Sequence, residues 1–254
     1  MIEINQIPIL SDNYTYLIID KVTRTCASVD PSISEPVISI IEKENLNLNY
    51  ILNTHHHWDH VGGNLELKKK YDCKIVGNLN DKDRIPGIDI CLNDGESFKL
   101  GNSKCKVFEI SGHTVGHIGY YFKDDNALFC GDTLFSLGCG RIFEGTHKQM
   151  LTSLNKIKKF PKDTKIYCGH EYTYKNAEFC LKYDNDNEDL KKKFEIIKKL
   201  RSKNLPTIPA VLKDELNSNI FLRCDQNDIK IKLNMKNQED FKVFEKVRDL
   251  KDAF

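Results

Sequence analysis

The sequence predicts a layered α/β fold followed by a smaller helical domain. Short apolar runs alternate with turn residues through about the first two thirds of the chain, which is typical of strands in a layered α/β arrangement. Helical patterns interrupt these runs near residues 33–45, 62–71 and 147–159. After residue 170 strand-like runs nearly vanish, and apolar residues recur at helical spacing. We therefore expect one domain over residues 1–170 and a helical domain over residues 171–254.

The predicted elements follow from local signals in the first domain. Residues 15–19, an apolar run near the amino terminus, are expected to form the first strand. The helix predicted over residues 147–159 begins at a capping-box pair, Thr146 and Gln149, and ends before Pro161. Each of these signals places an element boundary independently of the others.

The second domain has two helical faces and two exceptions. Leu190, Phe194, Ile197 and Leu200 recur on one face of a helix, and residues 241–250 repeat the pattern. Residues 205–209 should be extended, because residues that precede proline avoid the helical region. Residues 229–233 alternate Ile and Lys, which predicts a short strand or an extended segment.

Composition narrows the classes of function. The chain has 254 residues, is 40% hydrophobic and 30% charged, and carries a formal net charge of +1. This balance does not favour nucleic acid or an acidic membrane surface as a partner. No apolar run is long enough to span a membrane, no secretory leader is recognisable, and no obligate protein partner is indicated. Nine cysteines, an odd number without a C-x-x-C pair, indicate free thiols and hence a cytoplasmic location.

The densest motif is T-H-x-H-x-D-H at residues 54–60, directly after an apolar run. Imidazole and carboxylate are ligands that suit zinc, iron and similar ions. If the strand continues, His55, His57 and Asp59 point to one side, because side chains alternate along a strand. His55 and His57 would then hold one ion, and Asp59 and His60 a second. The alternative is a solvated, histidine-rich loop, but clustered ionisable groups need compensating partners.

Three further residues have matching placements. His113, Asp132 and His170 each follow a short apolar run and lie in a loop that contains glycine. A rigid strand positions such a side chain, and glycine lets the backbone turn. One histidine after a strand is weak support for a ligand, whereas these placements in order favour a metal site at the edge of a sheet.

These motifs resemble a known superfamily. H-x-H-x-D-H, G-H-T-x-G-H, G-D-T and the later G-H are similar to the metallo-β-lactamase superfamily of binuclear metallohydrolases over about residues 1–170. D-N-Y at 12–14, C-G-R-I-F-E-G-T at 139–146, C-G-H-E-Y-T at 168–173 and the ending R-D-L-K-D-A-F resemble the glyoxalase II, or hydroxyacylglutathione hydrolase, family. The resemblance implies a four-layer αββα sandwich with metals at one edge, followed by a helical carboxy-terminal domain.

The resemblance also implies a role for each ligand. His55, His57 and His113 would bind the first ion, and Asp59, His60 and His170 the second. Asp132 would bridge the two ions, so that Asp59 and Asp132 are the carboxylates of the catalytic centre. The cofactors would be two divalent ions, zinc first, with iron or manganese as alternatives. His56 and His117 are expected behind the ligands or facing solvent, and Trp58 against the loop.

The same resemblance implies the substrate, a glutathione thioester such as S-D-lactoylglutathione, hydrolysed in methylglyoxal detoxification. Arg141, Arg248 and Lys251 match positions that hold the glycine carboxylate, and guanidinium groups suit carboxylates. Tyr172 matches a residue that hydrogen-bonds the glutathione backbone. Phe143 departs from the family, in which many members carry tyrosine, and would lose one hydroxyl contact.

Two other functions are compatible with this metal core. A glutathione persulfide dioxygenase uses the same scaffold with one iron, but the long helical carboxy-terminal domain and the R-x-x-K ending disfavour it. A non-enzymatic metal-binding module is disfavoured by the complete ligand set. The metal core alone does not select a substrate, because one fold serves many reactions.

Overall fold

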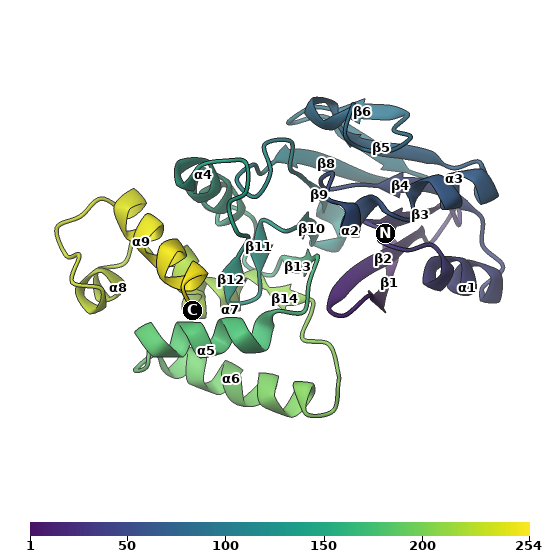
Figure 1. Ribbon diagram of the computed structural model, residues 1–254. Helices are drawn as coiled ribbons and strands as arrows, with labels where there is room; N and C mark the ends of the chain where they lie inside the picture. Colours follow the sequence, from purple (N-terminus) through teal and green to yellow (C-terminus); the bar gives the residue numbers. More distant parts are fainter. The chain divides into compact units, whose positions relative to one another are not determined.

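A computed structural model describes residues 1–254, and Figure 1 traces its elements along the chain. Packing divides the chain into two compact units. The first unit comprises Met1–Glu109 and Val115–Gly131, and the second comprises Ile110–Thr114 and Asp132–Phe254. The Ile110–Gly131 region is therefore divided between the units, with Ile110–Thr114 in the second and Val115–Gly131 in the first.

The first unit is built around a six-stranded sheet in the order β1-β2-β3-β4-β5-β6. The first strands are antiparallel neighbours, whereas β3 to β6 pair in parallel. Most residues of the central strands are buried, as expected of parallel strands with both faces covered. The strands are β1 (Ile2–Ile9), β2 (Asn13–Asp20), β3 (Cys26–Val29), β4 (Leu48–Leu52), β5 (Lys74–Asn78) and β6 (Ile90–Leu92).

Helices cover one face of this sheet. Val37 and Ile41 of α1 (Glu35–Lys43) and Leu67 of α3 (Asn64–Tyr71) share a buried cluster with Leu17 and Ile75 of the strands. The short helix α2 (Trp58–Val61) follows β4, and a 3-10 turn, η1 (Leu79–Asp81), follows β5. The predictions of helices near residues 33–45 and 62–71 are confirmed.

The other face of the sheet packs against a second group of antiparallel strands. Tyr16 of β2 meets Phe129 edge-on, with ring centroids 5.4 Å apart, and Tyr50 of β4 meets Phe98 at 4.9 Å. These strands, in the order β10-β9-β8-β7, are β7 (Ser97–Leu100), β8 (Ser103–Glu109), β9 (Ile118–Phe122) and β10 (Ala127–Gly131), with η2 (Lys123–Asp125) between the last two. The first unit thus has a helix layer and two sheet layers.

The second unit is mostly helical. Helix α4 (His147–Ile157) begins at the predicted capping box of Thr146 and Gln149, which is confirmed. The other elements are β11 (Leu134–Phe135), β12 (Gly138–Cys139), β13 (Lys165–Cys168), α5 (Thr173–Tyr183), α6 (Glu188–Arg201), β14 (Ala210–Val211), α7 (Leu212–Ser218), η3 (Ile220–Leu222), α8 (Asn227–Lys232) and α9 (Asp240–Asp252). Phe179 of α5, Phe221 of η3 and Phe244 of α9 form an aromatic core. The ring centroid of Phe221 lies 5.9 Å from that of Phe179 and 6.2 Å from that of Phe244.

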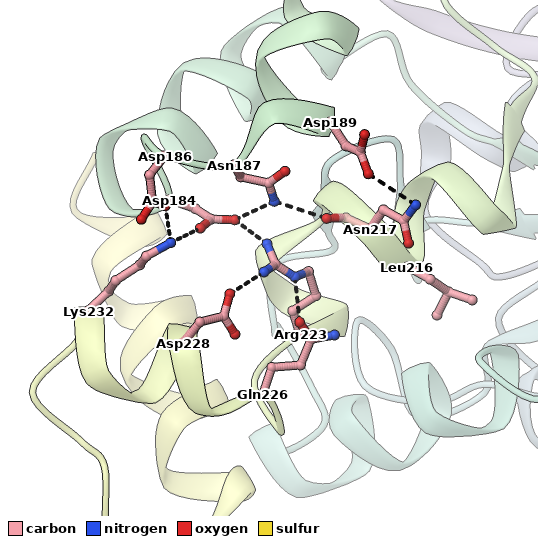
Figure 2. A pocket seen from close by; sticks show the side chains of 10 residues that line it. All are labelled: Asp184, Asp186, Asn187, Asp189, Leu216, Asn217, Arg223, Gln226, Asp228 and Lys232. Carbon is pink, nitrogen blue, oxygen red and sulfur yellow. Dashed lines mark hydrogen bonds and ion pairs between the residues drawn. The ribbon is translucent and has the colours of Figure 1, made fainter.

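A polar pocket of about 460 Å³ lies among α5, α6, α7, η3 and α8, and Figure 2 shows its lining. The buried Arg223 pairs with Asp184 and Asp228, and Lys232 of α8 pairs with Asp184 as well. Asn187, the N-cap of α6, donates to Asp184 at 2.7 Å. Because these charges satisfy one another, the pocket ties four elements together.

Two predictions of elements are wrong. The first strand is β1 rather than residues 15–19, which belong to the second strand; residues 2–9 include Pro8 and polar positions that mask the pattern. Residues 229–232 are helical rather than extended and Leu233 follows the helix; Ile229 is buried while Ile231 is 54% exposed, so the two do not share one face as they would on a strand. Residues 205–209, predicted to be extended, belong to no helix, and a bend lies at Pro209. None of the helices combines the length and apolar character that crossing a bilayer requires.

Candidate active site

The H-x-H-x-D-H motif occupies the loop after β4 and the helix α2 in the first unit. His55 and His60 are buried, and the ring centroid of His55 lies 4.7 Å from that of His57 and 4.1 Å from that of His60. The chain leaves the sheet after Leu52, so the strand alternation predicted to orient Asp59 is wrong. Asp59 instead lies in the first turn of α2.

Asp30 supports this loop from the end of β3. Its Oδ2 lies 3.1 Å from Nδ1 of His60, and its two oxygens accept from the backbone N–H and the hydroxyl of Thr54 at 2.8 and 2.6 Å. Asp30 has φ of 49°, a strained value that an aspartate tolerates better than most residues. Asp30, His55 and His60 could offer ligand atoms within 4.8 Å of one another. The Nδ1 contact makes Asp30 an outer partner that orients the His60 ring.

Asn13 holds the other predicted ligand of this helix. Its Nδ2 donates to Oδ2 of Asp59 at 3.1 Å and to the backbone oxygen of Asp59 at 3.2 Å. The amide thereby fixes one carboxylate oxygen of Asp59. The D-N-Y motif was the sequence signal for this residue, although it gave no role.

The two remaining histidines of the motif loops lie behind the predicted ligands. Nδ1 of His56 is 3.2 Å from the buried Asp81, and its Nε2 is 3.3 Å from Arg84. His117 is buried and stacks on His55, with centroids 4.7 Å apart and planes 17° apart. Trp58 was expected to pack against the loop. Instead, 70% of its surface is exposed to solvent, so this prediction is wrong.

In the second unit, two imidazoles converge on one carboxylate. Nε2 of His113 lies 3.6 Å from Oδ2 of Asp132, and Nε2 of His170 lies 3.2 Å from the same oxygen. Nδ1 of His113 is 2.7 Å from the backbone oxygen of Arg141, so a carbonyl acceptor fixes its ring tautomer. All three side chains are buried.

Glycine permits the turn that delivers Asp132. Gly131 ends β10 with φ of 46°, and a Cβ built there would lie 2.3 Å from the hydroxyl oxygen of Thr54. A larger residue would be both strained and obstructed at this position. The strand-then-glycine pattern therefore has the structural role that the sequence indicated.

Tyr172 lies directly over His170. Their rings stack with centroids 4.7 Å apart and planes within 4°, and Phe135 meets the Tyr172 ring edge-on at 5.3 Å. The Tyr172 residue as a whole is 37% exposed. The residue thus packs against one predicted ligand and faces solvent.

The predicted substrate residues of the second unit differ in exposure. The side chain of Arg141 is 59% exposed and Phe143 is 60% exposed, with its ring edge-on to His113 at 5.2 Å. Arg248 is buried, and its Nη1 donates to the backbone oxygen of Cys139 at 2.8 Å. Nζ of Lys251 lies over the ring of Phe179 at 5.2 Å.

Burial sets the protonation behaviour of two of these groups. It lowers the pKa of Lys251, and the neighbouring Arg248 cation lowers it further. Burial raises the pKa of the Cys139 thiol to about 11, although Arg248 opposes the shift. Cys139 is therefore a neutral thiol near pH 7, and its backbone carbonyl accepts from Arg248.

The donor set fits divalent metal ions. Neutral imidazoles and carboxylates are the ligands that zinc, iron and manganese accept in proteins. His60 and His113 each contact an oxygen through Nδ1, which would leave Nε2 as the atom able to bind a metal ion. The residues of both units therefore have the chemistry of a metal centre.

Two family models together cover most of the chain. The metallo-β-lactamase superfamily matches residues 12–170, and the hydroxyacylglutathione hydrolase C-terminus matches residues 171–254. A hydroxyacylglutathione hydrolase from Pelagibacter ubique is 52% identical over 99% of this chain and 100% of its own length. One from Methylococcus capsulatus is 45% identical over 100% of this chain and 99% of its own.

Solved structures show the same fold. ETHE1 from Myxococcus xanthus is 26% identical, with a TM-score of 0.62 over 87% of this chain and 99% of its own. A metallo-β-lactamase from Staphylococcus aureus superposes with a TM-score of 0.68 over 98% of this chain and 71% of its own, at 21% identity. The predicted fold class, a metallo-β-lactamase-like α/β sandwich with a helical carboxy-terminal region, is confirmed.

Proposed function

Because the chain belongs to the hydroxyacylglutathione hydrolase family of the metallo-β-lactamase superfamily, we propose that it hydrolyses S-D-lactoylglutathione and other 2-hydroxyacyl glutathione thioesters. The products are glutathione and the hydroxy acid, D-lactate for the first substrate, as methylglyoxal detoxification requires. The observation that carries the proposal is the convergence of His113 and His170 on Oδ2 of Asp132. A carboxylate placed between two imidazoles is suited to bridge two cations.

We assign the ligands as follows. His55, His57 and His113 would hold the first ion, Asp59, His60 and His170 would hold the second, and Asp132 would serve both. The buried imidazoles, the outer oxygens at Nδ1 of His60 and His113, and the Asn13 amide on Asp59 support this assignment. Zinc fits the donors best, and iron or manganese are the alternatives that the same donors accept.

When bound, the two ions supply Lewis acidity and lower the pKa of water, which provides a nucleophile near neutral pH. The protein's own part is to hold the reacting groups in place, which turns a bimolecular attack into a positioned one. Asp59 and Asp132 fix the ions through carboxylates. The leaving thiolate needs no strong general acid, and the motifs contain no separate proton donor.

In this proposal the substrate is selected by three basic residues of the second unit, Arg141, Arg248 and Lys251, which we call the clamp. Arg141, Arg248 and Lys251 hold the glycine carboxylate of glutathione, since guanidinium groups match carboxylate geometry. Tyr172 donates a hydrogen bond to the glutathione backbone, and its partly exposed position supports this role. Phe143 offers only a ring face where a tyrosine would add a hydroxyl.

We further propose that the chain is divided at residue 170 into two domains with different functions. Residues 1–170 carry the metal hydrolase function and residues 171–254 carry substrate binding, which the limits of the two family models support. The free cysteines, most of them buried, support action in a reducing compartment such as the cytoplasm.

The deciding experiment is steady-state hydrolysis of S-D-lactoylglutathione by the metal-loaded protein, followed as loss of the thioester. Turnover with KM between about 1 μM and 1 mM supports the proposal. Asp132→Asn should lose both bound metal, measured by elemental analysis, and turnover. Absence of turnover with metal bound would refute the assigned reaction, and oxygen uptake with glutathione persulfide would then identify a dioxygenase.

A further inference from the structure

Asp252, near the end of α9, joins two arginines of the clamp. Its Oδ1 accepts from Nη2 of Arg248 at 2.9 Å and from Nε of Arg141 at 3.3 Å. Arg248 precedes it by one helical turn, whereas Arg141 follows the strand β12. One carboxylate oxygen thus links two guanidinium groups that are distant in sequence.

The two arginines differ in how firmly the protein holds them. Arg248 is buried, and its Nη1 donates to the backbone oxygen of Cys139. The hairpin that carries Cys139 is itself fixed, since Nδ2 of Asn219 donates to the backbone oxygens of Phe135 and Gly138 at 3.3 and 3.1 Å. Arg248 is therefore a rigid part of the clamp.

Arg141 has the opposite character. Its side chain is 59% exposed, and a long, exposed arginine loses rotamer freedom when it binds a ligand. The bond to Asp252 uses Nε and leaves both Nη groups, the fork that matches a carboxylate, available to a ligand. Asp252 thereby links the exposed guanidinium of Arg141 to the buried one of Arg248.

The cluster retains positive charge despite Asp252. Arg141, Arg248 and Lys251 contribute three cations against one carboxylate, and Lys251 lies over the rings of Phe179 and Phe254 at 5.2 and 5.0 Å. A second carboxylate is still attracted, so Asp252 orients the cations without neutralising them.

We propose that Asp252 is a positioning residue for the substrate carboxylate: it aims the Nη groups of Arg141 before the ligand arrives. This inference rests on the proposed function, in which the clamp binds the glycine carboxylate of glutathione. Pre-ordering lowers the entropy cost of binding and affects ground state and transition state alike. Removal of Asp252 should therefore raise KM and weaken the binding of the product glutathione, and it should leave kcat nearly unchanged.

The test compares Asp252→Asn with the wild type, both metal-loaded. We expect KM for S-D-lactoylglutathione and Kd for glutathione to rise about 3- to 10-fold, with kcat within about twofold. Glutathione esterified at its glycine carboxylate should bind both proteins equally. The matched control is Asp249→Asn on the same helix, whose exposed carboxylate pairs with His147 and should leave all constants unchanged. An unchanged or lowered KM for Asp252→Asn overturns the proposal.

A double-mutant cycle separates positioning from a general structural effect. Asp252→Asn should add nothing to KM in an Arg141→Ala background, because its target is absent. An equal rise in both backgrounds overturns the proposal. Asp252→Glu keeps the charge and should give a KM between those of the wild type and Asp252→Asn. It serves as the second variant if the Asp252→Asn protein does not fold.

Calorimetric binding of glutathione distinguishes this inference from the proposed reaction. If glutathione binds and Asp252→Asn weakens it, but no thioester is hydrolysed, the hydrolase proposal fails and the positioning role stands. If the thioester is hydrolysed and Asp252→Asn binds glutathione like the wild type, the positioning role fails and the hydrolase proposal stands.

Discussion

Nδ1 of His60 lies 3.1 Å from Oδ2 of Asp30, and both side chains are buried. A carboxylate at Nδ1 accepts the ring proton and leaves the lone pair of Nε2 for a metal ion. The same oxygen of Asp30 accepts from the hydroxyl of Thr54. The contact therefore fixes both the orientation and the tautomer of a predicted ligand.

Asp30→Asn should weaken metal binding about 10- to 100-fold. The amide NH2 cannot accept the Nδ1 proton, so the ring would favour the tautomer with Nε2 protonated. Competition with a chelator measures the affinity. Asp20→Asn is the matched control, because Asp20 is also a buried aspartate at a strand end but bonds to Thr23 and Ser103. Equal metal affinity in Asp30→Asn and wild type would contradict the role given to Asp30.

Phe143→Tyr should improve substrate binding. The Phe143 ring is 60% exposed, so a hydroxyl can be added without displacing buried atoms. One hydrogen bond is worth about 0.5–1.5 kcal/mol, which corresponds to a KM about 2- to 10-fold lower. Steady-state kinetics on S-D-lactoylglutathione measure the change, with Phe143→Leu as a control that adds no donor. A KM equal to that of the wild type would mean that no hydroxyl contact forms at this position.

Arg248→Ala and Lys251→Ala should each raise KM much more than they lower kcat. The reason is that contacts with the substrate carboxylate stabilise the bound substrate and the transition state equally. Loss of a hydrogen bond to a charged group, about 1.5–3 kcal/mol, corresponds to a rise of roughly 10- to 100-fold. Arg248→Ala should also lower Tm, since it removes a buried donor from the Cys139 carbonyl. Lys246→Ala, on the exposed face of the same helix, is the control for kinetics and melting. An unchanged KM in both variants would show that Arg248 and Lys251 do not bind the substrate carboxylate.

The ligand motifs were predictable from sequence because they are dense and local. The four histidines and one aspartate of residues 54–60 indicate a metal site, and the strand-then-glycine pattern marks Asp132. Helix α4 was predictable for the same reason, since its capping box and apolar stripe are contained in one segment.

The remaining features depend on contacts between distant segments. Asp30 lies in none of the motifs, and the ending R-D-L-K-D-A-F contains Asp252 but gives it no role. Both roles come from contacts with His60 and Arg141, which only folding brings near. Helix α2 has four residues, too few for a helical period to register, so Asp59 was assigned to an extended segment. Trp58 was expected to pack, and only the tertiary structure shows it exposed.

Asp20 should make stability depend on pH. Burial alone would raise its pKa, but hydrogen bonds from Ser103, from the backbone and hydroxyl of Thr23 and from the backbone of Val22 hold it well below the usual range. A folded-state pKa below the unfolded value stabilises the protein above the unfolded pKa, about 3.9. That contribution is lost as the pH falls through this value toward the folded-state pKa.

The gap in unfolding free energy between wild type and Asp20→Asn should therefore be widest near neutral pH and should narrow below about pH 4. Urea unfolding of the metal-free proteins, at a series of pH values from 6 to about 3, measures the gap without interference from metal release. Glu3→Gln is the comparison variant, because the exposed Glu3 makes only a long ion pair with Arg24 at 3.9 Å and should show a small, nearly constant gap. A gap for Asp20→Asn that stays constant across the series would show that the carboxylate is not stabilised by its charge.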